Sequence, residues 1–287
     1  MDRENQKIKL KDGRILGFAE YGDPIGKPLF YLHGWPASHV SAKKYDDLAK
    51  KMHIRIIAPD RPGFYKSDFQ NGRTLLDWPD DVLALANHLN IKKFPVMGVS
   101  GGGPYAAACA YKIPNRLTKA GIVVGLGPTY IPGVLEGSHW LGKLGWQTYH
   151  YGVIRAFAAF SQLLVARYGS LVGIHGFLFP AKSDRKVYAA DRQVRDGTTQ
   201  CMREAYRQGS KGPAYDLKLY TSPWGFDVSH IRTKTYLFYG SDDENAPIAM
   251  GKYYASHIPG NTFTVYPGEG HLISVTHAAK IFKTLVS

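Results

Sequence analysis

The stretch Pro95-Val96-Met97-Gly98-Val99-Ser100-Gly101-Gly102-Gly103-Pro104 decides the fold of this chain. A short apolar run of β-forming residues ends at Val99, and an alanine-rich helical pattern begins near Gly102. Gly98-Val99-Ser100-Gly101-Gly102 between them fits Gly-x-Ser-x-Gly, the pattern of a sharp strand–turn–helix connection that exposes its serine. Gly98 and Gly102 are small enough to avoid collision in such a turn. We interpret Ser100 as a candidate nucleophile; the alternative is a glycine-rich connection that only packs closely.

Strands and helices alternate on both sides of this stretch. Further runs typical of strands are Ile8 to Leu10, Arg14 to Tyr21, Pro28 to Leu32, Ile54 to Ala58, Gly121 to Val124, Thr235 to Tyr239 and Thr262 to Tyr266. Helical patterns lie at Ser41 to Met52, Leu76 to Leu89, Pro247 to His257 and Ala278 to Val286. The first two strands flank Asp12-Gly13, which favours a hairpin. This alternation predicts an α/β fold with a largely parallel sheet.

The alternation stops after Pro128 and resumes near Thr235. The chain between these points is helical and aromatic in pattern, so we predict a helical cap at 129–229 inserted into a core made of 1–128 and 230–287. From Gly137 to Pro180 there is no Asp or Glu and aromatic residues are frequent, which suits an apolar pocket, a lid that meets lipid, or plain helix packing. From Lys182 to Lys211 charges of both signs predict a solvated face.

A serine hydroxyl needs a base, and the base needs an orienting acid. His271 follows the last predicted strand within Gly268-Glu269-Gly270-His271, at the carboxyl edge of the sheet where ligands bind in open α/β folds. Asp242 and Asp243 follow the preceding strand, and either could reach this histidine. The order serine, aspartate, histidine is that of one serine-hydrolase architecture.

Composition limits the other possibilities. The 287 residues carry 44% hydrophobic and 21% charged residues, which excludes a disordered chain and a disulfide-held mini-domain. The net charge of +13 raises a polyanion or anionic ester as partner, but the basic residues are dispersed and no nucleic-acid motif is present. Two cysteines argue against a zinc site, and we expect no metal or cofactor. The polar N-terminal stretch and the lack of a long apolar run predict a cytoplasmic protein without an integral membrane segment.

Four motifs in chain order make the sequence resemble the α/β-hydrolase superfamily over nearly its whole length. They are His33-Gly34-Trp35-Pro36, Asp60-Arg61-Pro62-Gly63-Phe64, the Gly-x-Ser-x-Gly turn at Ser100, and Gly240-x-x-Asp243-x-x-x-Pro247 with Gly268-x-Gly270-His271. The resemblance implies a mostly parallel eight-stranded sheet flanked by helices with an inserted cap. It also implies a triad of Ser100, Asp243 and His271, because the family's spacing selects Asp243 over Asp242.

The same resemblance implies an oxyanion hole made by the backbone N–H groups of Trp35 and Gly101. His33 and Gly34 would support that loop, as Gly98 and Gly102 support the turn, and Asp60 would shape a neighbouring turn. His-Gly-Trp-Pro also occurs in epoxide hydrolases and haloalkane dehalogenases, but those use an aspartate nucleophile where this chain has Ser100. The second half of the predicted cap, including Asp216 and Pro223-Trp224-Gly225-Phe226, resembles a bacterial hydrolase subgroup of undefined substrate.

These observations predict a serine hydrolase that acts on small-molecule carboxylic esters through an acyl-enzyme on Ser100. Two alternatives stay open. The same triad could act on lactones, carbon–carbon bonds or peptides, or carry out acyl transfer or perhydrolysis. The chain could also be a non-catalytic ligand receptor that keeps a hydrolase fold.

Overall fold

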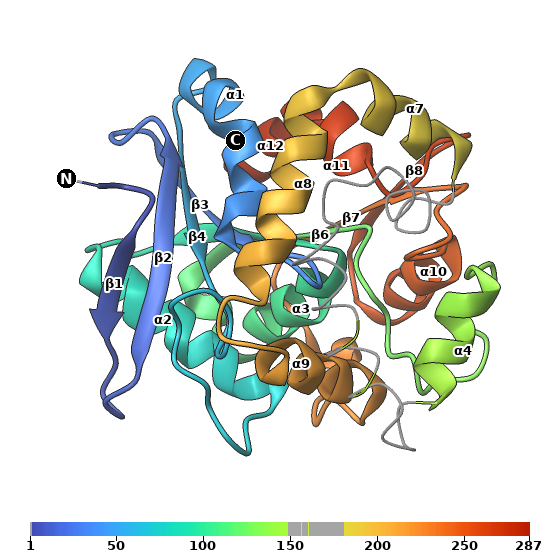
Figure 1. The fold of residues 1–287 in the computed structure, drawn as a ribbon, viewed down its shortest axis with the longest axis horizontal. Helices are drawn as coiled ribbons and strands as arrows, with labels where there is room; N and C mark the ends of the chain where they lie inside the picture. Colours follow the sequence, from blue (N-terminus) through green and yellow to red (C-terminus); the bar gives the residue numbers. More distant parts are fainter. Residues whose placement is uncertain (1, 149–155, 157–159, 161–180) are drawn as a thin grey trace.

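The central strands are almost wholly apolar, and this makes them the core of the molecule. In the computed structural model, which describes residues 2–148, 156, 160 and 181–287, all six residues of β5 (Phe94–Val99) are buried. A strand buried along its whole length has helices on both faces, which is the environment of a parallel strand in an α/β sheet. The sequence run before Ser100 therefore forms the middle of the sheet. Figure 1 shows the whole fold, coloured along the sequence.

The described residues form one eight-stranded sheet in the order β1-β2-β4-β3-β5-β6-β7-β8. Its strands are β1 (Gln6–Lys9), β2 (Ile15–Gly22), β3 (Lys27–Leu32), β4 (Ile54–Pro59), β5, β6 (Leu117–Val123), β7 (Thr235–Gly240) and β8 (Thr262–Tyr266). The hairpin β1–β2 and the pair β2–β4 are antiparallel, and the remaining pairs are parallel. The predicted α/β-hydrolase fold, with its mostly parallel sheet, is confirmed.

Helices cover both faces of this sheet. The core helices are α1 (Asp46–Lys51), α2 (Trp78–His88), α3 (Gly103–Lys112), α10 (Ile248–His257), α11 (Ile273–Thr276) and α12 (Ala278–Val286). A Cβ placed on Gly121 would meet Leu285 of α12, whereas Ile122 lies against Gly103 of α3. Because neighbouring residues of a strand point to opposite faces, α12 and α3 lie on opposite sides of β6.

Two predicted helices begin with a tighter turn. The expected helix Ser41 to Met52 is a 3₁₀ segment, η1 (His39–Tyr45), followed by α1. The expected helix Leu76 to Leu89 begins as a 3₁₀ turn at Leu75–Asp77, and α2 follows with Pro79 in its first turn. Proline lacks the N–H that a continuing helix would use, so the regular helix begins at this point.

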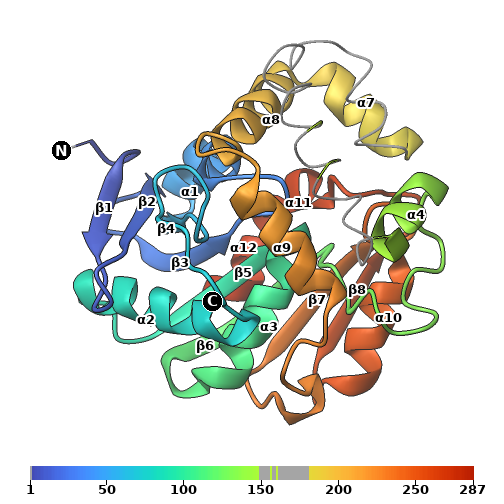
Figure 2. The ribbon, with the colours of Figure 1, turned by 60° about the horizontal axis from the view of Figure 1, so that its bottom comes forward.

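Four described helices belong to the chain between β6 and β7: α4 (Trp140–Thr148), α7 (Lys182–Ala190), α8 (Arg192–Ala205) and α9 (Lys211–Thr221). Figure 2 shows α7 and α8 next to each other at one end of the molecule, above α11. Much of the aromatic stretch from Gly137 to Pro180 lies outside the described residues. Among those described, no helix is both long and apolar enough to cross a bilayer. The boundaries 129–229 for the cap stay a prediction.

The expectation of a solvated face from Lys182 to Lys211 is wrong for one side of α8. Val194, Cys201 and Ala205 are buried, because their spacing places them on a single helical face that packs against η1. The charged residues of α8 itself are exposed or half-buried on its other faces. The high charge of this segment obscures the amphipathic pattern in the sequence, so the helical prediction did not include the face of α8 that lines the cavity described below.

Candidate active site

Ser100 stands on a sharp turn directly after β5. Its φ angle of +54° lies in the left-handed region, which costs a non-glycine residue on the order of 1–3 kcal/mol. A Cβ on Gly98 would lie 2.2 Å from the carbonyl oxygen of Gly102, and one on Gly102 would lie 2.1 Å from that of Leu32. The turn therefore requires glycine at both positions, as the sequence suggested. The strain is placed at the residue that the motif singles out.

His271 and Asp243 form the second part of the site. His271 Nδ1 lies 2.7 Å from Asp243 Oδ2, and the histidine side chain is 13% exposed. The other carboxylate oxygen, Oδ1, accepts hydrogen bonds from the backbone N–H groups of Asn245 and Ala246, so Asp243 is held from both sides. Burial lowers the pKa of His271, but the adjacent Asp243 carboxylate outweighs this effect and the net pKa is raised.

The neighbouring acids differ from Asp243. Asp242 is exposed and its Oδ1 accepts a hydrogen bond from the Ser241 hydroxyl, so it does not contact the histidine. Glu244 lines the same cavity as His271. Of the two aspartates that the residues alone left open, the structure places Asp243 against His271.

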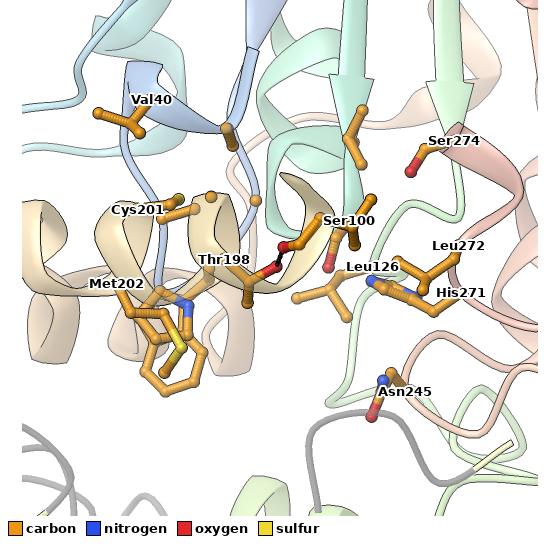
Figure 3. A pocket seen from close by; sticks show the side chains of 18 of the residues that line it. Val40, Ser100, Leu126, Thr198, Cys201, Met202, Asn245, His271, Leu272 and Ser274 are labelled. Atoms are coloured by element: carbon orange, nitrogen blue, oxygen red, sulfur yellow. Dashed lines mark hydrogen bonds between the residues drawn. The ribbon is translucent and has the colours of Figure 1, made fainter. Parts of the chain in front are cut away.

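Ser100 and His271 line one cavity of about 700 Å³ at the carboxyl end of the central strands (Figure 3). Most of its lining atoms are apolar, with contributions from η1, α4, α8 and the loops after β3, β5 and β8. Apolar lining residues include Val40, Leu126, Leu144, Trp146, Val194, Met202, Leu217 and Leu272. A volume of this size suits a small or medium organic ligand.

The loop after β3 approaches the nucleophile closely. A Cβ on Gly34 would lie 3.3 Å from Ser100 Cβ and 3.8 Å from its Oγ. A Cβ on Gly101 would lie 3.0 Å from the backbone nitrogen of Trp35. The backbones of Trp35 and Gly101 thus lie close together beside Ser100.

A buried ion network lies behind this loop. Arg61 Nε lies 2.7 Å from Asp216 Oδ2, and Arg73 Nη2 lies 2.5 Å from Asp216 Oδ1. The Tyr105 hydroxyl donates a hydrogen bond of 2.6 Å to the same carboxylate. Burial raises the pKa of a carboxyl group, but the two arginines prevail and lower the pKa of Asp216 to about 2. Asp216 is therefore a fixed negative charge inside the protein.

This network holds the loop after β3 in place. Arg61 donates through Nη1 to the carbonyl of His33 and through Nη2 to that of Gly34. Trp35 Nε1 donates to the carbonyl of Pro213 in α9. Hence α9, which belongs to the insertion, and the loop after β4 together position the peptides beside Ser100.

His33 contributes to the same support. Its Nδ1 lies 2.9 Å from the carbonyl oxygen of Gly34, and its Nε2 accepts from the backbone N–H of Arg61. Burial, and then the Arg61 charge, hold its pKa well below the ordinary value. One neutral tautomer satisfies both ring nitrogens, with Nδ1 as the donor and Nε2 as the acceptor. His33 is therefore placed to support the loop and not to act as a base.

Sequence reasoning missed three parts of this site. Asp60 accepts from the backbone and ring nitrogens of His39, which matches a structural role, but the charged residue that reaches the loop is its neighbour Arg61. Asp216 was noted only as part of a resemblance. Asp184, which accepts a hydrogen bond from the backbone N–H of His271, was assigned to a solvated face. An isolated acid flanked by apolar residues, as in Ala214-Tyr215-Asp216-Leu217, was the available signal for a buried ion pair.

Comparison with known proteins agrees with this fold. A model described as the alpha/beta hydrolase fold matches residues 27–278. A non-heme haloperoxidase from Rhodococcus erythropolis is 23% identical, over 98% of this chain and 97% of that protein. A bifunctional esterase/perhydrolase from Acinetobacter calcoaceticus is also 23% identical, over 98% of each chain. The structure of an esterase from Exiguobacterium antarcticum has a TM-score of 0.71 at 16% identity, covers 98% of this chain and 97% of its own, and shows a likeness of fold. Together these relatives support a hydrolase, and the chain belongs to the alpha/beta hydrolase fold family.

Proposed function

We propose that this protein is a serine hydrolase that cleaves carboxylic esters through an acyl-enzyme on Ser100. One arrangement carries the proposal: His271 is held 2.7 Å from Asp243 and shares an apolar cavity with Ser100, the residue whose φ of +54° sets it on the turn. A buried acid–histidine pair beside a nucleophile on a strained turn is the constellation used for acyl transfer.

In the first half-reaction, Ser100 Oγ attacks the ester carbonyl carbon while His271 Nε2 takes the hydroxyl proton. Asp243 keeps Nδ1 protonated and stabilises the imidazolium that forms. The backbone N–H groups of Trp35 and Gly101 stabilise the negative oxygen of the tetrahedral intermediate. Each such donor is worth about 3 kcal/mol of barrier. His271 then protonates the departing alkoxide, and the alcohol leaves.

In the second half-reaction, a water molecule replaces the alcohol. His271 Nε2 takes its proton, the hydroxide attacks the acyl carbon, and the same two amides stabilise the second oxyanion. Collapse of this intermediate returns the proton to Ser100 Oγ and releases the carboxylic acid. The chain's own residues supply every proton transfer in this cycle.

The helices of the insertion contribute to substrate choice in this proposal. Residues of α4 and α8 line the cavity together with Ser100, and these walls are largely apolar. They would receive an apolar acyl or alcohol group by removing its surface from water, which is worth about 0.8 kcal/mol per CH₂ group. The 129–229 insertion would then act as a cap whose lining limits ester length.

A graded panel of chromogenic acyl esters tests the proposal, with Ser100→Ala as its partner. We expect turnover with an optimum acyl length and loss of at least about 10³-fold in kcat for the variant. A fluorophosphonate should label Ser100 stoichiometrically in the wild-type protein. Failure to hydrolyse any ester, combined with no labelling, would favour a ligand receptor; labelling without ester turnover would favour another reaction on the same triad.

Perhydrolysis is a second candidate, favoured by the likeness to the bifunctional esterase/perhydrolase, which aligns over nearly the whole chain. Hydrogen peroxide would replace water in the second half-reaction, so that the acyl-enzyme yields a peroxy acid and free Ser100. The enzyme's own residues undergo no oxidation in this exchange. Peroxy-acid formation from a short ester and peroxide, absent in Ser100→Ala, would support it; release of the carboxylic acid alone would exclude it.

A further inference from the structure

A carboxylate from the insertion binds the backbone of the histidine loop. Asp184, in the first turn of α7, is buried. Its Oδ2 accepts a hydrogen bond of 2.7 Å from the N–H of His271, and its Oδ1 accepts one of 2.8 Å from the N–H of Leu272. Both oxygens of one side chain thus hold two consecutive peptides, 87 and 88 residues further along the chain.

The loop is shaped to admit this carboxylate. A Cβ on Gly270 would lie only 2.4 Å from Asp184 Oδ2 and 2.8 Å from the Cβ of Ala181. Any larger residue at Gly270 would therefore push the start of α7 away from the loop. The Asp184 carboxylate thus occupies the space that a side chain at Gly270 would need.

A small apolar cluster reinforces the same contact. Tyr188 of α7 and Val194 of α8 pack with Leu272, the residue after the histidine. Val187 and Val275 lie against this cluster. The helices of the insertion therefore hold the loop by both hydrogen bonds and packing.

We propose that Asp184 is a positioning residue for His271. Because it binds the peptides of His271 and Leu272, the position of α7 determines the position of the histidine side chain. This inference rests on the proposed function of the triad. It also assigns α7 a part in catalysis that is separate from lining the cavity. A displacement of the base by about 1 Å can cost 10²-fold in rate, so a fixed backbone at this point matters.

The charge of Asp184 acts on the same histidine. Burial lowers the pKa of His271, and Asp243 and then Asp184 raise it, whereas Lys44 from η1 lowers it. Glu244 also lines the cavity that His271 faces. Replacing Asp184 by a neutral residue should therefore lower the pKa of His271, an effect that a purely structural role would not produce.

Asp184→Asn tests the proposal with little change of size. It removes the negative charge and one of the two acceptors. We expect about tenfold or greater loss of kcat/KM on an ester and a shift of the acidic limb of its pH profile to lower pH. NMR titration of the His271 ring, assigned by its absence in His271→Asn, should show the same shift without relying on activity.

Asp191→Asn is the matched control. Asp191 accepts from the N–H of Val194 at the start of α8, so it anchors the same pair of helices without contacting the histidine loop. We expect a near wild-type Tm, because asparagine caps a helix about as well as aspartate, and an unchanged His271 titration. An unchanged titration and pH profile in Asp184→Asn would overturn the positioning role.

Two further arms make the result interpretable. If Asp184→Asn does not fold, Gly270→Ala displaces the carboxylate while keeping its charge, and we expect lower kcat/KM with wild-type KM; wild-type kinetics would overturn the proposal. Fluorophosphonate labelling of wild-type Ser100 tests the proposed function separately. Labelling together with an unshifted Asp184→Asn rejects the positioning role alone, and no labelling together with a shifted titration rejects the ester chemistry alone.

Discussion

The Tyr220 hydroxyl oxygen lies 2.9 Å from the carbonyl oxygen of Gly101, the residue that follows the candidate nucleophile. The same hydroxyl lies 3.1 Å from Asp216 Oδ2, so its single proton is placed between a peptide of the turn and the buried carboxylate. Tyr220 belongs to α9 of the insertion. Gly101, the residue whose own N–H is proposed to bind the oxyanion, is thus held through its carbonyl by α9.

Tyr220→Phe removes this contact while keeping the ring. We expect a loss of about 1 kcal/mol in the free energy of unfolding, because one buried hydrogen bond is lost. If Gly101 is an oxyanion donor, kcat should fall several-fold with KM nearly unchanged, since the donor acts in the transition state. Chemical denaturation and steady-state kinetics measure the two effects. A change confined to KM would contradict the assignment.

Asp216→Asn should be among the most damaging single changes outside the triad. It leaves Arg61 and Arg73 buried without their carboxylate, which costs about 3–5 kcal/mol in stability. Because Arg61 also holds the carbonyls of His33 and Gly34, ester turnover should fall with stability.

Asp80→Asn is the control for Asp216→Asn. Asp80 pairs with Lys112 at 2.7 Å at the protein surface, where both side chains are more than a third exposed. Such a pair is worth about 0–1 kcal/mol, so this variant should retain near wild-type stability and activity. Equal losses of unfolding free energy in the two variants would show that the buried Asp216 network contributes no more stability than a surface ion pair.

The pH dependence of kcat/KM should report His271. Protonated imidazole cannot accept the Ser100 proton, so activity should rise with pH through a midpoint above the ordinary histidine pKa. Lys44→Met should raise this midpoint further, because Lys44 lowers the pKa of His271. Lys43→Met is the control, since Lys43 is paired with Glu4 at 2.7 Å. A lower midpoint in Lys44→Met would contradict the electrostatic assignment.

The backbone conformation of Ser100 should lower the stability of the protein. Its left-handed φ of +54° strains serine and alanine alike, but glycine adopts this conformation freely. We expect Ser100→Gly to have a Tm above that of Ser100→Ala, with both variants inactive on esters. Calorimetry of the two proteins checks this, and an equal Tm would show that the turn stores no strain at this residue.

The strands and turns that depend on a local sequence pattern could be predicted from the sequence. The apolar runs became strands at nearly the expected residues, and β8 spans the predicted Thr262 to Tyr266. Gly-x-Ser-x-Gly indicated the turn because its geometry excludes side chains at Gly98 and Gly102, a constraint that acts within a few residues.

The support behind the site could not be predicted in the same way. Asp184 and Asp216 act through contacts with residues 87 and 155 positions away, and no short-range pattern encodes such pairings. Asp243 was separable from Asp242 only through the family's spacing, because both follow the same strand. The amphipathic pattern of α8 was present in the sequence but was obscured by its high charge.

The two buried aspartates of the insertion limit how this protein could be recombined with its relatives. A chimera that received a foreign insertion would leave Arg61 and Arg73 without a counter-charge and the peptides of His271 and Leu272 without an acceptor. Exchange of the insertion would therefore need acids at positions equivalent to Asp184 and Asp216, together with Gly270. In this chain the insertion supplies contacts that hold the candidate site together. Substrate specificity therefore cannot be changed by exchanging the insertion alone.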